Sequence, residues 1–156
     1  MNFTEDELEV AYLEILESLG WECIDGRKLE RDDYHSVVLE ENLREVVYNI
    51  NKEMPSSAKE EAIRKVILLS HPNLIRSNEE FHNMLVNGVD VVEYKDKDGN
   101  KRSGGKVYLI DFKNIKKNEF QAINQFTIVG KSKRRPDIIL FINGLPLVVI
   151  ELKSLS

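Results

Sequence analysis

The sequence predicts an α/β domain with an α+β-like layout, in which helices come first and a mixed or antiparallel sheet follows. Apolar residues recur at helical spacing in residues 1–88, whereas residues 89–156 contain short apolar runs bounded by turn residues. Between two of these runs stands Asn143-Gly144, a strong hairpin signal because a type I′ turn needs positive φ at both central residues. The chain is long enough for one core, so we expect a single domain over residues 1–156.

Four helices are expected in the first half of the chain. A capping box opens the first, third and fourth, because a Ser or Thr stands three residues before a Glu. The expected helices run from Thr4 to Gly20, from about Val37 to Ile50, from Ser57 to near His71-Pro72, and from Ser77 to Asn87-Gly88. The apolar residues at helical spacing in the first helix are Leu8, Tyr12, Ile15, Leu16 and Leu19.

Apolar runs of strand length follow in the second half. The first two flank a charged, Gly-rich hairpin loop at Lys95–Gly105. The last two flank Asn143-Gly144 and are expected to be strands buried on both faces. The expected strands are Val89–Tyr94, Lys106–Phe112, Phe120–Val129, Ile138–Ile142 and Leu145–Ile150.

Composition excludes several classes of protein. There is no run of eighteen apolar residues and no signal-peptide pattern, so we expect a cytoplasmic protein without a membrane partner. The single cysteine, Cys23, excludes an internal disulfide and a thiolate zinc cluster. His35, His71 and His82 share no ligand spacing, so we interpret them as surface or capping residues.

The net charge of −5 is unevenly distributed along the chain. Residues 1–93 carry 21 acidic and 9 basic residues, whereas residues 94–156 carry 13 basic and 6 acidic residues. The second part is therefore basic, as a surface that faces phosphate groups should be. The acidic part is expected to face solvent or a partner protein.

The last twenty residues carry the strongest functional pattern. Asp137 precedes one strand of the expected hairpin, and Glu151 and Lys153 follow the other. Side chains alternate along a strand, so Glu151 and Lys153 should point the same way. Two carboxylates can hold Mg²⁺, and a nearby ammonium can orient or activate a water that attacks a phosphodiester. The pattern therefore predicts a nuclease site, although a solvated Asp and a simple Glu–Lys pair would give the same spacing.

The same residues resemble a known family. Asp137, thirteen intervening residues and Glu151-x-Lys153 resemble the PD-(D/E)xK nuclease motif. The longer stretch from Arg135-Pro136-Asp137 through Asn143-Gly144 to Glu151-Leu152-Lys153-Ser154 is similar to the nuclease region of the R (restriction) subunit of type I restriction–modification enzymes. Further stretches similar to that family are Leu8 to Trp21, Asn83 to Val89, Leu109 to Phe112 and Asn118 to Phe126.

The resemblance implies a restriction-endonuclease-like core, with a central mixed sheet flanked by helices and truncated after the Glu-x-Lys strand. It also implies an N-terminal fragment of a larger ATP-dependent subunit, which works with modification and specificity subunits on double-stranded DNA. Mg²⁺ would be the cofactor of this fragment, and ATP would be used by the missing translocase. The family's Gln-x-x-x-Tyr motif lies beyond Ser156, so whether the fragment cuts alone stays open.

The resemblance also gives roles to residues. Asp137, Glu151 and the backbone carbonyl of Leu152 would bind Mg²⁺, and Lys153 would position or deprotonate the water or stabilise the phosphate charge. Related nucleases often add a carboxylate from the first helix, for which Glu9 is the first candidate and Glu5 the second. Gln125 is a further candidate near the site. The candidates for phosphate contact are Lys131, Lys133, Arg134 and Arg135, for which a solvated basic loop is the alternative.

Two alternative functions remain at this point. The chain could be a catalytically silent module that docks the motor onto its partners through the acidic helical half. It could also be an independent nuclease of DNA repair or junction resolution that shares the motif. Metal-dependent cleavage would distinguish a nuclease from the docking module. Dependence of cleavage on ATP and on partner subunits would distinguish a restriction subunit from an independent nuclease.

Overall fold

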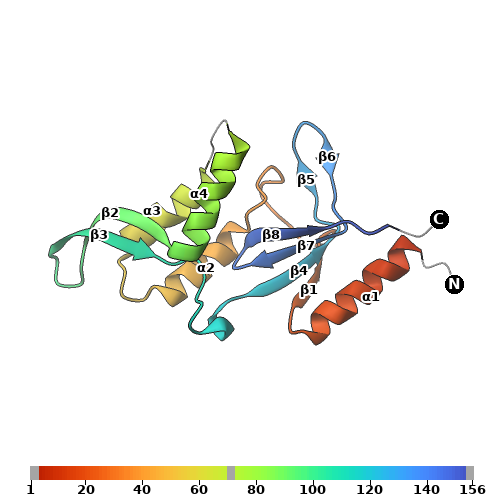
Figure 1. Cartoon of the computed structure of the whole chain (residues 1–156), viewed down its shortest axis with the longest axis horizontal. Helices are drawn as coiled ribbons and strands as arrows, with labels where there is room; N and C mark the ends of the chain where they lie inside the picture. The colour runs from red at the N-terminus through yellow and green to blue at the C-terminus, as the bar shows by residue number, and fades with distance from the viewer. Residues whose placement is uncertain (1–3, 70–72, 154–156) are drawn as a thin grey trace. The chain divides into compact units, whose positions relative to one another are not determined.

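The computed structural model describes residues 4–69 and 73–153 and divides the chain into two compact units (Figure 1). Unit 1 comprises Met1–Leu39 and Glu119–Ser156, and unit 2 is Glu40–Asn118. Unit 1 is therefore discontinuous in sequence, and the boundary between the units differs from the expected change at residues 88 and 89. The single domain over residues 1–156 stays a prediction.

Unit 1 contains a four-stranded mixed sheet in the order β1-β4-β7-β8. Strand β1 pairs parallel with β4, and the other neighbours pair antiparallel. The predicted α/β layout with a mixed sheet is confirmed. The elements of this unit are α1 (Glu5–Ser18), β1 (Glu22–Asp25), β4 (Phe120–Asn124), β5 (Ile128–Val129), β6 (Lys133–Arg134), β7 (Ile138–Ile142) and β8 (Leu145–Ile150).

Unit 2 contains helices and a separate antiparallel hairpin, β2–β3. Helix α2 begins with the acidic residues Glu40 and Glu41, and the side chain of Asn73 caps helix α4, as expected for helix N-termini. The elements of this unit are α2 (Glu40–Ile50), α3 (Ser56–Ile67), α4 (Leu74–Asn87), β2 (Val89–Lys95), β3 (Lys101–Val107) and the short 3₁₀ helix η1 (Ile115–Lys117).

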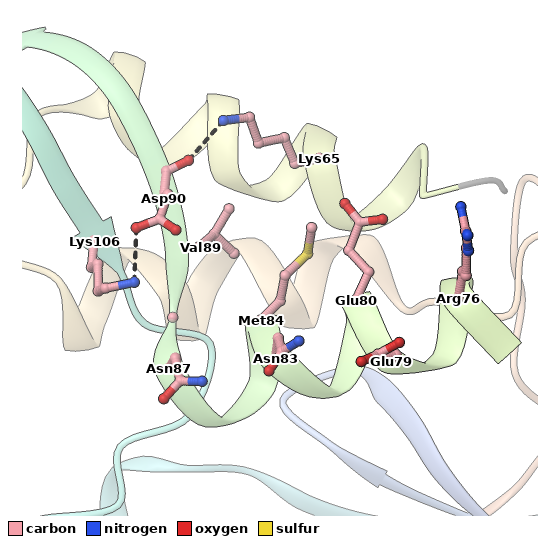
Figure 2. A pocket seen from close by; sticks show the side chains of 11 residues that line it. Lys65, Arg76, Glu79, Glu80, Asn83, Met84, Asn87, Val89, Asp90 and Lys106 are labelled. Atoms are coloured by element: carbon pink, nitrogen blue, oxygen red, sulfur yellow. Dashed lines mark hydrogen bonds and ion pairs between the residues drawn. The ribbon is translucent and has the colours of Figure 1, made fainter.

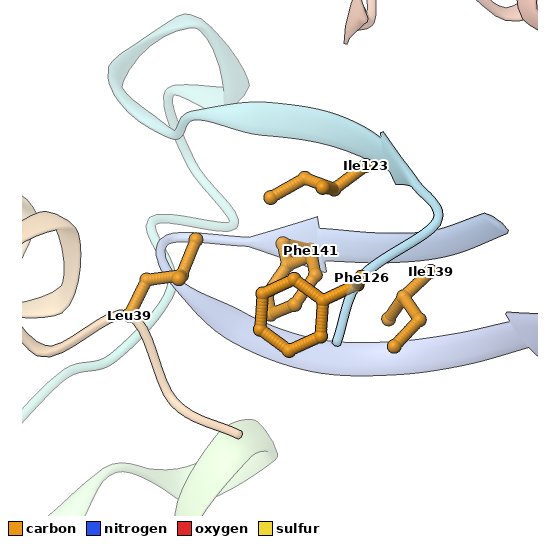
Figure 3. Close-up of a cluster of buried hydrophobic side chains, with 5 residues drawn as sticks. All are labelled: Leu39, Ile123, Phe126, Ile139 and Phe141. Carbon is orange, nitrogen blue, oxygen red and sulfur yellow. The ribbon is translucent and has the colours of Figure 1, made fainter. Parts of the chain in front are cut away.

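Both faces of the sheet in unit 1 bury apolar side chains. Leu13 and Leu16 of α1 pack against Ala122 and Ile138 on one face. The opposite face is covered by the segment after β1, whose Leu39 joins the second cluster. Figure 3 shows that cluster, which consists of Leu39, Ile123, Phe126, Ile139 and Phe141. The alternation of Ile138 and Ile139 between the two clusters is what a strand buried on both faces requires.

The hairpin that joins β7 and β8 forms as predicted. Asn143 and Gly144 have φ values of 54° and 77°, which a type I′ turn requires. Asn143 is fully buried, and its Oδ1 accepts a hydrogen bond of 2.8 Å from the Glu119 backbone N–H. The Asn143 N–H in turn donates to the Glu119 carbonyl, and the Leu39 N–H donates to the Gly144 carbonyl. The turn therefore anchors both chain segments at which unit 2 leaves unit 1.

Several helix expectations need correction. The capping box at Thr4 is present, and Leu16 of the expected apolar face is buried as predicted. Tyr12, Ile15 and Leu19 of that face are exposed, because the sheet meets α1 through Leu16 and the unexpected Leu13. Helix α2 begins at Glu40, three residues after the expected start.

Helix α3 begins at Ser56 after an extended Pro55, so Ser57 lies inside the helix and does not cap it. Helix α4 begins at Leu74, because the Asn73 side chain accepts hydrogen bonds from two backbone N–H groups of the first turn. The cap predicted at Ser77 is therefore wrong. The end predicted at His71-Pro72 lies outside the described residues, and Gly88, with a φ of 79°, ends α4 as predicted.

The strand expectations also change in places. Strand β3 covers Lys101–Val107 rather than Lys106–Phe112, because the Asp96 carboxylate accepts hydrogen bonds from the Asp98 and Asn100 N–H groups and closes a tighter turn. The strand expected over Phe120–Val129 is interrupted at Gln125, where φ is 51°.

Strand β8 has the predicted bounds, but Val148 and Val149 are exposed because β8 lies at the edge of the sheet. It is therefore not buried on both faces. Strands β1 and β6 were not anticipated.

Candidate active site

The predicted site residues lie at one end of the unit 1 sheet. The strand register places Asn124 of β4 opposite Ile138 of β7, and Ile138 opposite Ile150 of β8. One residue further along, the Gln125 N–H donates a hydrogen bond of 2.9 Å to the Asp137 carbonyl. Glu151 directly follows Ile150. The fold therefore brings the two parts of the motif, which are separated by thirteen residues in sequence, to the same sheet end.

The Asp137 carboxylate connects these two parts directly. Its Oδ2 accepts a hydrogen bond of 2.6 Å from the Leu152 backbone N–H. This bond takes the place of a further rung of the β7–β8 ladder, so β8 ends at Ile150 as predicted, and Glu151 and Lys153 lie beyond the end of the strand. Buried Leu152 stands between these two exposed residues. Oδ2 of Asp137 is thus bonded to the backbone, while the Glu151 and Lys153 side chains are exposed and can reach a ligand.

Glu9 reaches the same sheet end from helix α1. Its Oε1 accepts a hydrogen bond of 2.7 Å from the Asn124 side-chain amide, and its Oε2 accepts one of 2.6 Å from the Gln125 side-chain amide. The half-buried Glu9 is thus held through both carboxylate oxygens. Glu5, the second candidate, lies exposed in the first turn of α1.

Asn124 is a residue that the sequence analysis did not assign to the site. It is buried at the end of β4, and it does more than pack there, because its side-chain amide donates a hydrogen bond to Glu9. The signal in the sequence was the polar pair Asn124-Gln125 directly after the apolar run of β4. Its partner lies 115 residues away, so the sequence could not show what the amide contacts.

Gln125 adopts an unusual backbone conformation at this position. Its φ of 51° lies in the left-handed region, which costs a non-glycine residue roughly 1–2 kcal/mol. In return, the backbone N–H of Gln125 bonds to Asp137 and the side chain bonds to Glu9. Strain of this kind concentrates at functional sites, where the surrounding structure maintains it.

The donor set suits a hard divalent cation that keeps several waters. Among residues 4–69 and 73–153, no three His, Cys, Asp or Glu side chains lie close enough together to hold a metal ion. Mg²⁺ differs from zinc in this respect, because it commonly binds through one or two carboxylates plus waters and substrate phosphate oxygens. Asp137, Glu151 and a backbone carbonyl are oxygen donors of that kind. The residues present therefore fit Mg²⁺ better than a metal that needs a closed protein cage.

The predicted basic segment forms a short hairpin that leads into Asp137. Lys133 and Arg134 make up β6, which pairs antiparallel with β5. Lys131 and Arg135 flank this strand, and all four cationic side chains are exposed. The segment therefore displays four positive charges directly before the motif, which is the placement expected for phosphate contact.

Arg31 fixes the start of this basic hairpin. Its guanidinium lies 3.9 Å from the centre of the Phe126 ring and donates hydrogen bonds to the Ser36 and Thr127 carbonyls. Burial lowers the pKa of Arg31 from its ordinary value. The sequence analysis did not assign this residue.

A hollow of about 890 Å³ lies in unit 2, between α4 and the start of β2 (Figure 2). None of the residues that line it belongs to the predicted nuclease site. Two of its cations already bind Asp90, since Lys106 Nζ lies 2.8 Å from the carboxylate and Lys65 Nζ lies 2.7 Å from the carbonyl. Glu79 and Glu80 add negative charge. This mixed lining does not suit a polyanion, so we assign no nuclease chemistry to the hollow.

The remaining expectations concern histidines and membranes. His35 and His82 are exposed, as predicted for surface residues, and His71 lies outside the described residues. None of the helices in the described part of the chain combines the length and the apolar character needed to cross a bilayer.

Comparison with known proteins identifies the family. Residues 2–156 match the family model described as type I restriction enzyme R protein N terminus. The chain is 38% identical over 159 residues to the type I restriction enzyme HindI endonuclease subunit of Haemophilus influenzae, a match that covers 96% of this chain and 15% of that protein. It is 33% identical over 156 residues to the putative type I restriction enzyme MjaIXP endonuclease subunit of Methanocaldococcus jannaschii, with 94% of this chain and 15% of that protein covered.

The chain thus spans about 15% of the length of these two relatives. The match to the family model extends over nearly the whole chain, including every residue of the sheet end described above. The chain therefore belongs to the family formed by the N-terminal region of the R subunit of type I restriction enzymes.

Proposed function

We propose that this chain supplies the DNA-cleaving site of a type I restriction enzyme, through a PD-(D/E)xK arrangement of Asp137, Glu151 and Lys153. The observation that carries the proposal is the 2.6 Å hydrogen bond from the Leu152 N–H to the Asp137 carboxylate. It joins the two parts of the motif in the folded chain, so the spacing in the sequence corresponds to proximity in space. The names of the relatives, which are endonuclease subunits, support the same function.

Asp137, Glu151 and the Leu152 carbonyl would hold Mg²⁺, and Glu9 would add a negative charge at the same sheet end without joining those two carboxylates on the metal. Bound there, Mg²⁺ would neutralise charge on the phosphate and acidify the attacking water. The Asp137 side chain would offer Oδ1 to the metal, while Oδ2 stays bonded to the Leu152 N–H and fixes the rotamer. Asn124 and Gln125 hold the Glu9 carboxylate in position, so its ordering is completed before any ligand arrives.

Lys153 acts on the phosphate and the water. An ammonium has three donors and no acceptor, so in its charged form it can hold a phosphate oxygen or orient the attacking water. Lys153 is exposed at the end of the segment that follows β8, within two residues of Glu151. Its positive charge would stabilise the negative charge that develops on the reacting phosphate.

The basic hairpin would bind the DNA backbone. Lys131, Lys133, Arg134 and Arg135 are exposed, and contacts of such residues with phosphate oxygens do not depend on base sequence. Cleavage without base readout fits an enzyme in which modification and specificity subunits recognise the site. We further propose that ATP acts in a translocase elsewhere in the full protein, and that the enzyme works in the cytoplasm.

The test uses the complete enzyme, which consists of the full-length R subunit with its modification and specificity subunits. Supercoiled plasmid cleavage and ATP hydrolysis are measured together in Mg²⁺. Asp137→Asn keeps an oxygen that can accept the Leu152 N–H bond but removes the charge, and Glu151→Gln and Lys153→Ala remove the other two groups. We expect each variant to lose cleavage by about 10²-fold or more while ATP hydrolysis stays unchanged.

A matched control and the contrary outcomes complete the design. Glu14→Gln removes one exposed carboxylate from α1 and should leave cleavage unchanged, whereas Glu9→Gln, on the same helix, should reduce it. Cleavage retained in both Asp137→Asn and Lys153→Ala would exclude a nuclease site here and leave a docking module. Cleavage by the wild type without ATP or partner subunits would favour an independent repair or junction nuclease.

A further inference from the structure

A short loop in unit 2 is closed by hydrogen bonds between its two ends. The Asp111 backbone N–H donates 2.8 Å to Asn118 Oδ1, and Asn118 Nδ2 donates 2.9 Å to the Asp111 carbonyl. Asn118 Nδ2 also lies 3.1 Å from the Ile115 carbonyl. Asn118 is buried, so this one side chain joins the loop ends from inside. We call residues 111–118 the 111–118 loop.

The interior of the loop is equally well ordered. The Asp111 carboxylate accepts hydrogen bonds from the Asn114 N–H at 2.8 Å and the Lys113 N–H at 3.0 Å. These backbone donors, with Asn114 the largest contributor, hold the pKa of Asp111 below its ordinary value although burial opposes them. Helix η1 follows directly, and its Lys117 N–H donates to the Asn114 carbonyl. The negative charge of Asp111 is therefore directed into the loop.

The outer surface of the loop combines positive charge with large apolar side chains. Phe112 is 61% exposed and Ile115 is 62% exposed. Lys113, Lys116 and Lys117 are exposed as well, and Lys117 forms an ion pair of 3.7 Å with Asp111 within the loop. The loop is held in one conformation by its own hydrogen bonds, yet its aromatic ring and its three lysines stay exposed and gain no stability from burial. An ordered loop with such side chains at the surface is typical of a binding site.

The charge pattern favours a polyanion over a protein as the partner. Asp111 is the sole acid among residues 111–118, and it is bonded within the loop. The β2–β3 hairpin provides a contrast, because Lys97 in its turn and Arg102 in β3 form ion pairs of 2.6 Å and 2.7 Å with acidic side chains. Lysines bind backbone phosphates, and an exposed aromatic ring can stack on a base or enter an unstacked step.

We propose that the 111–118 loop is a second DNA-contacting surface of this chain, formed by other residues than the cleavage site. Lys113, Lys116 and Lys117 bind backbone phosphates, and Phe112 contacts the face of a base. This surface deepens the proposed function, on which it rests in taking DNA as the substrate. It would hold DNA independently of the metal and of cleavage, so binding can be measured where no cutting occurs.

The test measures binding of the full 156-residue chain to fluorescently labelled duplex and single-stranded DNA by anisotropy. EDTA is present throughout, so the result does not depend on the cleavage site. Salt is varied, because each phosphate contact contributes about 0.9 to the slope of log K against log salt for duplex DNA and about 0.7 for single strands. Replacing Lys113, Lys116 and Lys117 by Ala should therefore lower the duplex slope by about 2 to 3.

The matched control replaces Lys52, Lys95 and Lys101 by Ala, which removes the same charge from exposed positions of the same unit. We expect this control to change the slope by less than about 1. Phe112→Ala should weaken binding by about fivefold or more at an unchanged slope, whereas Phe112→Trp should retain affinity because its ring is also planar and aromatic. A larger effect of Phe112→Ala on single strands than on duplex would identify stacking on unpaired bases. The reverse would identify insertion at a duplex step.

Three outcomes would overturn the proposal. Equal losses in the loop variant and the control variant would show a general effect of charge. Unchanged binding in the loop variant would remove the surface from DNA recognition. A loop variant that binds DNA normally but fails to assemble with the modification and specificity subunits would identify a protein-docking surface. The plasmid cleavage assay reports separately on Asp137 and Lys153, so the nuclease proposal can fail or hold without changing these results.

Discussion

Replacing Asn143 by Ala should destabilise unit 1 through two separable effects. The φ of 54° places Asn143 in the left-handed region, where a residue other than Gly, Asn or Asp costs roughly 1–2 kcal/mol. The fully buried Oδ1 also accepts a 2.8 Å hydrogen bond from the Glu119 N–H. Loss of the acceptor for a buried donor costs about 1–3 kcal/mol. We therefore expect Asn143→Ala to lower the free energy of unfolding by about 2–5 kcal/mol in total.

A second variant at the same position separates the two effects. Asn143→Gly tolerates the positive φ but still lacks the acceptor, so it should recover about 1 kcal/mol relative to Asn143→Ala. Urea unfolding followed by circular dichroism measures both, and Ser132→Ala in an exposed turn serves as a control that should change stability by less than about 0.5 kcal/mol. An Asn143→Ala variant as stable as the control would refute the whole argument. Equal losses for Ala and Gly would refute the backbone part.

Three further predictions concern other positions. Gly26→Ala would place a Cβ closer to the Asn124 carbonyl oxygen than real Cβ atoms approach. We therefore expect the free energy of unfolding in urea to fall by about 1–3 kcal/mol. An unchanged stability would show that the backbone moves freely here. Arg31→Ala should lower the free energy of unfolding by about 2 kcal/mol, because the stacking on Phe126 and the hydrogen bonds to carbonyl groups are lost. Arg31→Lys should recover less than half of this loss, because an ammonium cannot stack on the ring and bind two carbonyl groups at once. Full recovery by Lys would contradict this. Because the folded pKa of Asp111 is lowered, the carboxylate contributes its full stabilisation above the ordinary aspartate pKa of about 3.9 and loses it as the pH falls through the lowered value. The amide chemical shifts of Lys113 and Asn114 should therefore change with pH only below the ordinary aspartate pKa. A change at higher pH would refute the assigned contacts.

The sequence was most informative where structure is determined locally. Strands β7 and β8 have the bounds that the apolar runs predicted, because Asn143-Gly144 determines the turn through its own backbone preferences. The spacing of Asp137 and Glu151 around that hairpin likewise needs only local pairing. These features could therefore be derived from twenty consecutive residues.

Features that depend on distant partners could not be derived in this way. Strand β1 is four residues long and pairs in parallel with β4, almost one hundred residues later, so no local alternation marks it. The contact of Glu9 with Asn124 and Gln125 is equally distant in sequence. Composition also gives no sign of where unit 2 begins or ends. The predicted apolar face of α1 was wrong in part for the same reason: Leu16 is buried, but helical periodicity does not show which other apolar side chains a sheet will cover.

The discontinuity of unit 1 has a consequence for engineering the chain. Leu39 and Glu119, between which unit 2 is inserted, both bond to the turn residues of the β7–β8 hairpin. A deletion that replaces residues 40–118 by a linker of roughly eight residues would shorten the loop about tenfold and lower its closure cost by about 2 kcal/mol. The hydrogen bonds that hold Glu9, Asp137 and Leu152 all lie within the retained segments. A minimal protein of about half the length could therefore present the same carboxylates, and the excised part could be exchanged for another module without redesigning the sheet.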